Sequence, residues 1–160
     1  MDAVNDIREK ENLKRLEYSL YLQDLNDIRS KEVWYVIANK GVIMGQGKSH
    51  TRPDGTSFST VGFGADMENN TQTRDYTDKI QFDANGNAFI EALRTVDIGN
   101  GMATHYYEKV TLDEYVQECG TDVADAWYRS EGHRRNIVDL AANTATVSCY
   151  VKDGWIYIAN

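Results

Sequence analysis

The stretch of residues 147–158 constrains the fold more than any other segment. Apolar and polar residues alternate from Val147 to Lys152, the two-residue turn Asp153-Gly154 follows, and the run Trp155-Ile156-Tyr157-Ile158 comes directly after it. Alternation with a period of two is typical of a half-buried strand, and Asp-Gly is a preferred two-residue hairpin turn. The segment therefore predicts an antiparallel β-hairpin, which excludes an all-helical fold.

The first third of the chain predicts helices instead. A helical spacing of three and four relates Leu22, Leu25, Ile28 or Arg29, Glu32 or Val33, and Val36. Ser19 is placed to cap this helix and Gly41 to end it. A shorter amphipathic pattern precedes it, at Val4, Ile7, Leu13 and Leu16. Helices followed by a hairpin favour an α+β fold.

Two segments between these ends carry turn signals. Residues 45–64 contain five glycines and the turn Pro53-Asp54-Gly55, which predicts a structured loop of the kind that carries functional side chains. Asp83-Ala84-Asn85-Gly86 predicts a hairpin. We expect its strands to carry Ile80 and Phe82 on one side and Ala88 and Ile90 on the other, with a short helix after it. Alternatively, Asn87 caps a helix that bears Phe89, Leu93 and Val96.

A clearer helix start lies at Thr111. Thr111 and Glu114 have the spacing of a capping box, in which each side chain bonds the other residue's backbone N–H. We expect Gly120 to end this helix and Thr121 to cap a second one, which bears Val123, Ala126 and Trp127.

Composition excludes several classes of protein. The formal net charge is -8, and the basic cluster Arg129, Arg134 and Arg135 is short, so no nucleic acid is expected as a partner. No apolar run reaches the roughly 20 residues of a membrane helix, so no integral membrane segment is predicted. Repeats and linkers are absent, which favours one domain over residues 1–160. Cys119 and Cys149 can form one disulfide or remain free, and free thiols are favoured because such cysteines pack as small hydrophobes.

Three short motifs carry chemistry. The stretch 127–137 reads WYRSEGHRRNI and places a hydroxyl, a carboxylate and an imidazole close together. The stretch 49–58 reads SHTRPDGTSF and places a second histidine beside the Pro-Gly turn. Glu68-Asn69 lies between them. Two imidazoles and a carboxylate suit zinc, and without metal the same groups suit acid–base work.

These motifs together resemble the CAP superfamily of SCP-like extracellular domains, which includes cysteine-rich secretory proteins, antigen 5 and plant pathogenesis-related proteins. WYRSEGHRRNI resembles the W-x-x-S-x-G-H-R-x-N-I signature of its bacterial branch. SHTRPDGTSF resembles the loop with the first cleft histidine, and VSCYVKDGWIYIAN is similar to the closing strands. The resemblance implies a three-layer α-β-α sandwich. It covers most of residues 1–69 and 121–160.

The family's Glu-Asn motif lies a short helix before the tryptophan, whereas Glu68 lies far from Trp127 in this sequence. Residues 70–110 are therefore predicted to be an insertion. Otherwise Glu108 or Glu118 supplies the equivalent carboxylate.

The resemblance also implies a functional cleft. Its expected residues are His50, Glu68, Asn69, Ser130 and His133, and a divalent metal, zinc, would be held by His50, His133 and Glu68. The expected function is an extracellular or cell-surface module that binds a small ligand, a lipid, a divalent metal, or a host or cell-wall component. The leader would lie outside this sequence. Two alternatives are a metal-assisted, peptidase-like hydrolase using the same residues and a structural or adhesion module.

Overall fold

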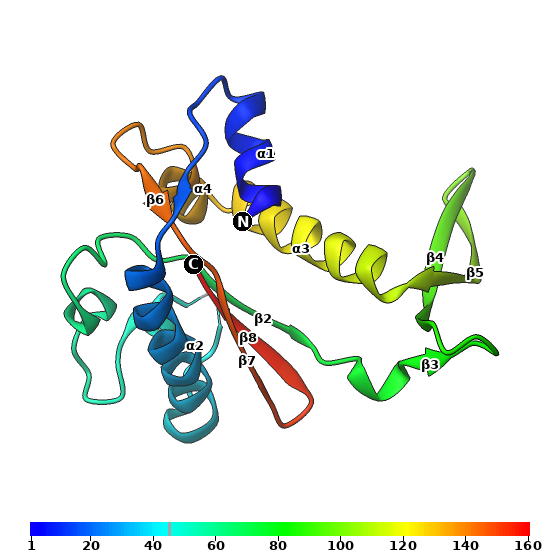
Figure 1. The fold of residues 1–160 in the computed structure, drawn as a ribbon, viewed down its shortest axis with the longest axis horizontal. Coiled ribbons are helices and arrows are strands. Elements are labelled where there is room, and N and C mark those ends of the chain that lie inside the picture. Colours follow the sequence, from blue (N-terminus) through cyan, green and yellow to red (C-terminus); the bar gives the residue numbers. More distant parts are fainter. Residues whose placement is uncertain (45) are drawn as a thin grey trace. The chain divides into compact units, whose positions relative to one another are not determined.

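The structure, a computed structural model, describes residues 1–44 and 46–160. Its contacts divide the chain into two compact units, which are described separately (Figure 1). Unit 1 comprises Met1–Asp75 with Val123–Asn160, and unit 2 comprises Tyr76–Asp122.

Unit 1 contains most of the helices. Its elements are α1 (Asp2–Lys10), β1 (Glu17–Tyr18), α2 (Leu20–Lys40), the 3-10 helices η1 (Lys48–His50) and η2 (Phe58–Val61), β2 (Asn70–Arg74), the end of α3 (Leu112–Arg129), α4 (Glu131–Ile137), β6 (Thr144–Ala145), β7 (Ser148–Lys152) and β8 (Trp155–Ala159). Unit 2 holds η3 (Thr77–Lys79), β3 (Gln81–Phe82), β4 (Ala88–Gly99), β5 (Met102–Thr111) and the start of α3.

The sheet of unit 1 has the order β2-β8-β7 and is antiparallel throughout. The predicted hairpin is confirmed, with Lys152 paired to Trp155 and with Asp153 and Gly154 both at positive φ, 54° and 76°. Strand β8 is central because β2 pairs along its other edge, from Asn70 opposite Ala159 to Arg74 opposite Trp155. Residues 70–74 thus belong to the sheet, so the expected insertion does not begin at residue 70.

Helix α2 covers one face of this sheet, and its predicted ends are confirmed. The Ser19 hydroxyl accepts a hydrogen bond from the backbone N–H of Leu22, and Gly41 ends the helix at a φ of 64°. The helix packs on β7 and β8 (Figure 1). The ring of Trp34 lies 5.6 Å from that of Tyr150 on β7.

The opposite face is covered by α1, α4 and the end of α3. Ile158 of β8 joins a buried cluster there with Val4, Ile7, Leu16, Ala124, Trp127 and Ile137. Burial of each large apolar side chain stabilises the fold by roughly 1.5–3 kcal/mol. Helices on both faces of one sheet make a three-layer α-β-α sandwich, which confirms the predicted α+β fold.

Arg8 fixes α1 to the end of α4. Its side chain is 2% exposed, and its guanidinium donates to the carbonyl oxygens of Lys14, Ile137 and Asp139 over 2.7–3.0 Å. A buried cation needs such partners because burial removes its water. The carbonyls therefore hold α1 in place without a carboxylate.

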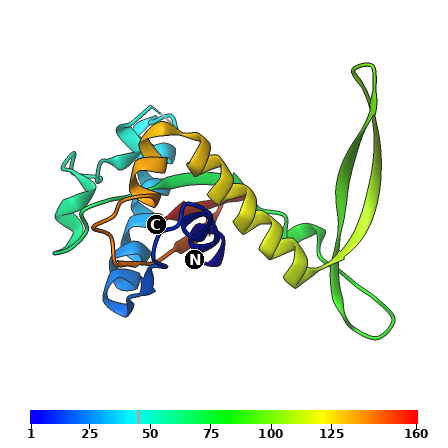
Figure 2. The same ribbon diagram turned by 90° about the horizontal axis from the view of Figure 1, so that it is seen from above.

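Unit 2 contains a long two-stranded ribbon formed by β4 and β5 (Figure 2). The predicted hairpin at Asp83 is confirmed, since β3 pairs with the start of β4 and the Asp83 carboxylate accepts from the backbone N–H groups of Asn85 and Asn87. The predicted helix after it is wrong. Ile90 and Ala92 are buried while Glu91 and Leu93 are exposed, which is the alternation of a strand.

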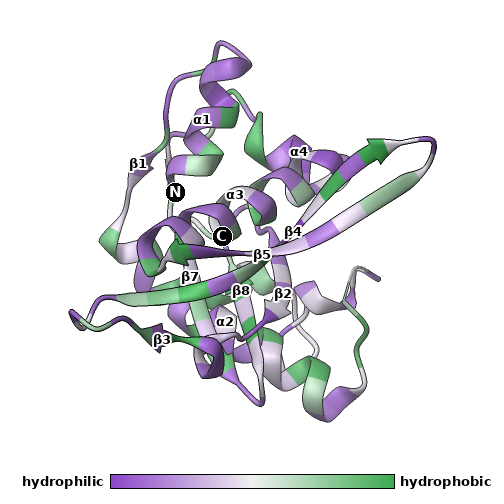
Figure 3. Ribbon diagram, turned by 90° about the vertical axis from the view of Figure 1, so that its right-hand side faces the viewer, coloured by the Kyte–Doolittle hydropathy of each residue, from purple (hydrophilic) through white to green (hydrophobic). Residues whose placement is uncertain are grey.

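Hydrophobic residues continue along this ribbon toward the turn between β4 and β5, beyond the buried residues Ile90 and Ala92 (Figure 3). Leu93, Ile98, Met102 and Tyr107 are all more than half exposed there. Neither face of that part is covered within unit 2, so its sequence carries no clear alternation.

Helix α3 differs in one respect from the prediction. The capping box is confirmed, because the Thr111 hydroxyl accepts from Glu114 N–H and the Glu114 carboxylate accepts from Thr111 N–H. The expected break at Gly120 and Thr121 is wrong. The helix runs from Leu112 to Arg129, and the Thr121 hydroxyl bonds the Gln117 carbonyl instead of capping a new helix.

Both cysteines are free thiols, as favoured from the sequence, although Cys149 is exposed and not buried. Among the described residues, no helix combines the length and apolar character that a membrane crossing requires.

Candidate functional site

A buried ion pair forms the base of the candidate site. Arg29 of α2 is 1% exposed and Glu68, just before β2, is 4% exposed. Arg29 Nε lies 2.6 Å from Glu68 Oε2, and Arg29 Nη2 lies 3.2 Å from Glu68 Oε1. The two groups form a bidentate pair, the geometry that holds a guanidinium and a carboxylate most firmly.

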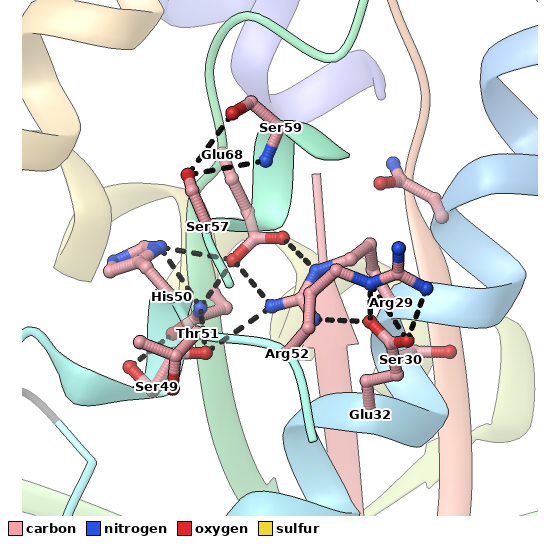
Figure 4. A network of polar contacts seen from close by, with 12 residues as sticks. Arg29, Ser30, Glu32, Ser49, His50, Thr51, Arg52, Ser57, Ser59 and Glu68 are labelled. Atoms are coloured by element: carbon pink, nitrogen blue, oxygen red, sulfur yellow. Dashed lines mark hydrogen bonds and ion pairs between the residues drawn. The ribbon is translucent and has the colours of Figure 1, made fainter. Parts of the chain in front are cut away.

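Two further side chains contact the same carboxylate. Asn70 Nδ2 donates to Glu68 Oε1 over 2.7 Å. His50 Nδ1 lies 3.0 Å from that oxygen (Figure 4). Burial raises the pKa of Glu68, but the hydrogen bonds from His50 and Arg29 and the charge of Arg29 outweigh it, so the pKa is lowered overall. Glu68 is therefore held as a carboxylate.

The network continues away from His50. Arg29 Nη1 also lies 2.6 Å from Glu32 Oε2, and Arg52 donates to Glu32 Oε1 over 2.7 Å (Figure 4). Charges therefore alternate in sign along Glu68, Arg29, Glu32 and Arg52. Arg52 precedes the Pro53 turn, so the chain of ion pairs links the loop that carries His50 to α2.

His50 and His133 face one another on the more open side of Glu68. Their ring centroids lie 5.9 Å apart, and the His50 side chain is 27% exposed. Phe58 contacts the His50 ring edge to face at 6.0 Å. Burial lowers the pKa of His133, and neighbouring His50 lowers it further, so both favour the neutral imidazole.

The other two expected site residues, Ser130 and Asn69, make no side-chain hydrogen bond to either imidazole among the described residues. Ser130 is exposed at the start of α4, and its hydroxyl makes no capping bond. Asn69 Oδ1 accepts from Asn136 Nδ2 over 2.9 Å, and its backbone pairs with Asn160. Asn70, and not Asn69, contacts Glu68 and His50 with its side chain.

The three candidate carboxylates differ in their neighbours. Glu108 and Glu118 belong to unit 2, where both bind Arg94 over 2.7 Å. Glu68 contacts His50 directly. Of the three candidates, Glu68 is the carboxylate beside the histidine.

The donors fit zinc only in part. Within the described residues, no group of three or more His, Cys, Asp or Glu side chains could hold a metal ion. Both Glu68 oxygens already accept hydrogen bonds, and Arg29 would repel a second cation bound to them. The two imidazoles suit zinc, whereas Glu68 fits behind them as the hydrogen-bond partner of a ligand.

Sequence reasoning missed Arg29, Asn70 and Asn136 as parts of the site. Arg29 carried a usable signal, because it is a charged residue on the apolar stripe of α2. Asn136 donates both to the Glu68 carbonyl and to Asn69 Oδ1, but no spacing rule connects residues so far apart in sequence.

Comparison with known proteins identifies the family of this chain. The model of the CAP family, the cysteine-rich secretory protein family, matches residues 1–159. The chain therefore belongs to the CAP family. No curated protein matches its sequence.

One similar solved structure is that of an extracellular protein containing a SCP domain from Bacillus anthracis. It shares 15% identity with this chain at a TM-score of 0.44. The match covers 98% of this chain but 36% of that one, so this chain spans little more than a third of that protein's length.

Proposed function

We propose that this CAP domain is a binding module whose recognition groups are the imidazoles of His50 and His133, and that it is not a hydrolase. The observation that carries the proposal is that both carboxylate oxygens of Glu68 already accept hydrogen bonds. A metal-assisted hydrolase needs a carboxylate that holds the attacking water. Arg29, Asn70 and His50 hydrogen-bond to the two oxygens of Glu68, so each oxygen already has a partner and neither is free to hold an attacking water.

The ligand of this pair is a divalent metal ion, with zinc as the best match. The Glu68 carboxylate at His50 Nδ1 favours a proton on that nitrogen, which leaves the lone pair of Nε2 to bind a metal ion. Carboxylate partners of this kind orient imidazoles for zinc. Neutral His133 supplies the second nitrogen. With two protein donors, the ion would keep open positions for a further ligand, and its affinity would be modest.

Calorimetric titration of the intact protein with zinc tests this proposal. We expect one zinc per chain, lost in His50→Ala and in His133→Ala. His105→Ala is the matched control, because this third histidine lies in unit 2 and bonds Thr95 over 2.9 Å. Equal zinc binding in all three variants would overturn the metal assignment.

Glu68→Gln separates a positioning role from a ligand role. Loss of a hydrogen-bonded partner behind a metal ligand weakens binding by about 10–100-fold. The substitution keeps the shape of Glu68, and circular dichroism at pH 7 is the check that the variant is folded. The binding assignment would be contradicted if the wild type hydrolysed peptide or ester substrates and Glu68→Gln abolished that hydrolysis.

We also infer an extracellular or cell-surface location, which the membership in a family of secretory proteins supports. Fractionation of the source cells with an antibody against this domain tests it. The protein should appear in the medium or at the surface, and recovery from the cytosol alone would count against the inference.

A further inference from the structure

Unit 1 contains a cavity that is distinct from the histidine pair. Its volume is about 510 Å³, and neither His50 nor His133 lines it. It lies among the start of α2, residues 58–69 and residues 136–146. Apolar side chains form part of its wall: Leu16, Leu22, Leu25, Phe58, Val61 and Ile137. A cavity of this size is within the range that binds small organic molecules, about 300–1,000 Å³.

The rest of the wall is rich in side-chain amides, contributed by Asn26, Asn69, Asn136, Asn143 and Asn160. Four of these five amides donate to oxygens of the protein itself. Asn26 and Asn160 donate to the Thr146 carbonyl, Asn143 to the Ala141 carbonyl, and Asn136 to Glu68 and Asn69.

Asn69 is the exception. Its side chain is 1% exposed, and its Nδ2 is buried with no acceptor among the described residues. The orientation of the amide is fixed, because Oδ1 must accept from Asn136 Nδ2. A buried donor without a partner is unfavourable, so an acceptor brought by an occupant of the cavity would relieve it.

The wall also offers acceptors. The side-chain oxygens of Asn26, Asn143 and Asn160 accept no hydrogen bond from the described part of the chain, since each of these amides is engaged through its nitrogen. The residues that line the cavity thus include one donor without an acceptor, side-chain oxygens that accept no hydrogen bond from the described residues, and apolar side chains. A secondary amide, with one C=O and one N–H, is complementary to that set.

Charge narrows the ligand class further. Asp66 and Asp139 line the cavity, and Arg29 is the one cationic side chain among its described lining residues. Arg29 is already paired with Glu68 and Glu32. An anion such as a fatty-acid carboxylate would meet uncompensated negative charge, so a neutral ligand is favoured.

We propose that this cavity binds a neutral molecule carrying a secondary amide beside a compact apolar group, with its carbonyl oxygen accepting from Asn69 Nδ2. The amide could belong to an N-acetylated sugar or to a capped amino acid. The site goes beyond the metal site proposed above and does not depend on it.

Saturation-transfer NMR on the intact protein tests the ligand class with four probes. N,N′-diacetylchitobiose and N-acetyl-leucine N-methylamide carry the amide in a sugar and in a peptide frame, and either one binding supports the proposal and identifies the source. Cellobiose lacks the amide, and octanoate is an apolar anion. Binding of neither amide, or equal binding of all four probes, overturns the proposal.

Substitutions in the cavity wall test whether the amide probes bind in this cavity. Ala65→Phe fills the cavity from its wall and should abolish amide binding, whereas Ala126→Phe, at an exposed position of α3 outside the cavity, should not. Asn69→Ala should weaken binding by about tenfold, the value of one hydrogen bond. Unchanged amide binding in Ala65→Phe would overturn the assignment to this cavity.

Two controls distinguish loss of the cavity site from unfolding and from loss of the metal site. Ala142→Phe fills the same cavity from another segment, so it replaces Ala65→Phe if that variant is unfolded by circular dichroism. Zinc titration of each folded variant reports on the histidine pair separately. Loss of amide binding with zinc binding retained is the expected result, and failure of zinc binding alone would count only against the metal site.

Discussion

Arg29 and Glu68 are joined by two hydrogen bonds while both side chains are almost completely buried. Glu68 also contacts His50, so this pair connects the interior of the sandwich to the more open imidazoles. One carboxylate therefore contacts both the buried Arg29 and the histidine of the proposed metal site.

Removal of that carboxylate should destabilise the fold strongly. Glu68→Ala leaves the Arg29 guanidinium buried with Glu32 as its one carboxylate partner among the described residues, and breaking a buried pair in this way costs about 3–5 kcal/mol. Urea unfolding monitored by tryptophan fluorescence measures the loss. Glu108→Ala is the control, because it removes an exposed partner of Arg94 and should change stability little. Similar losses in both variants would contradict this account.

Acid should destabilise the protein partly through the same residue. The folded-state pKa of Glu68 lies below its value in the unfolded chain, about 4.3. The stability from its ionisation is complete above that pH and is lost as the pH falls through the lower folded pKa. Urea midpoints should therefore fall more steeply below about pH 4.3 in the wild type than in Glu68→Gln. Parallel curves for the two proteins would show that Glu68 does not contribute.

Two glycines should respond to alanine in opposite directions. Gly41 ends α2 at a φ of 64°, where an added Cβ meets no atom within 4 Å but the backbone is strained, so Gly41→Ala should destabilise by about 1–2 kcal/mol. Gly120 lies within α3, and a Cβ added there also meets no atom within 4 Å. Gly120→Ala should therefore stabilise that helix by roughly 0.5–1 kcal/mol. Residue-resolved amide hydrogen exchange measures both effects. Stabilisation by Gly41→Ala would show that its positive φ carries no strain.

The capping box should protect the first turn of α3. Thr111→Ala removes the hydroxyl that accepts from Glu114 N–H, so amide exchange at Glu114 and Tyr115 should accelerate. Thr121→Ala is the matched control, since that hydroxyl bonds a carbonyl within the same helix and caps nothing. Equal exchange rates in the two variants would show that the cap does not hold the helix start.

Local signals in the sequence predicted those elements that depend on local chemistry. The Ser19 cap, the Gly41 stop and the hairpins at Asp83 and Asp153 are each determined by residues close to one another along the chain. The family resemblance supplied the arrangement of these elements into layers.

Elements determined by distant partners were mispredicted or missed. Phe89, Leu93 and Val96 have helical spacing, but β4 is a strand because ten residues of β5 lie beside it. Gly120 resembled a helix end, although no left-handed residue is needed there. In the site, Asn70 and Asn136 act through partners brought close by the fold, so the sequence around them gives no sign of that role.

The order of strands in the central sheet has a consequence for synthesis on the ribosome. Strand β8 fills the middle of the sheet although it is the last strand in the sequence, and Asn69, next to Glu68, pairs its backbone with Asn160. A nascent chain that already displays α2 and β2 has no central strand for either to pack against. Packing of α2 and β2 around the central strand can therefore be completed only after residues 155–160 have left the exit tunnel.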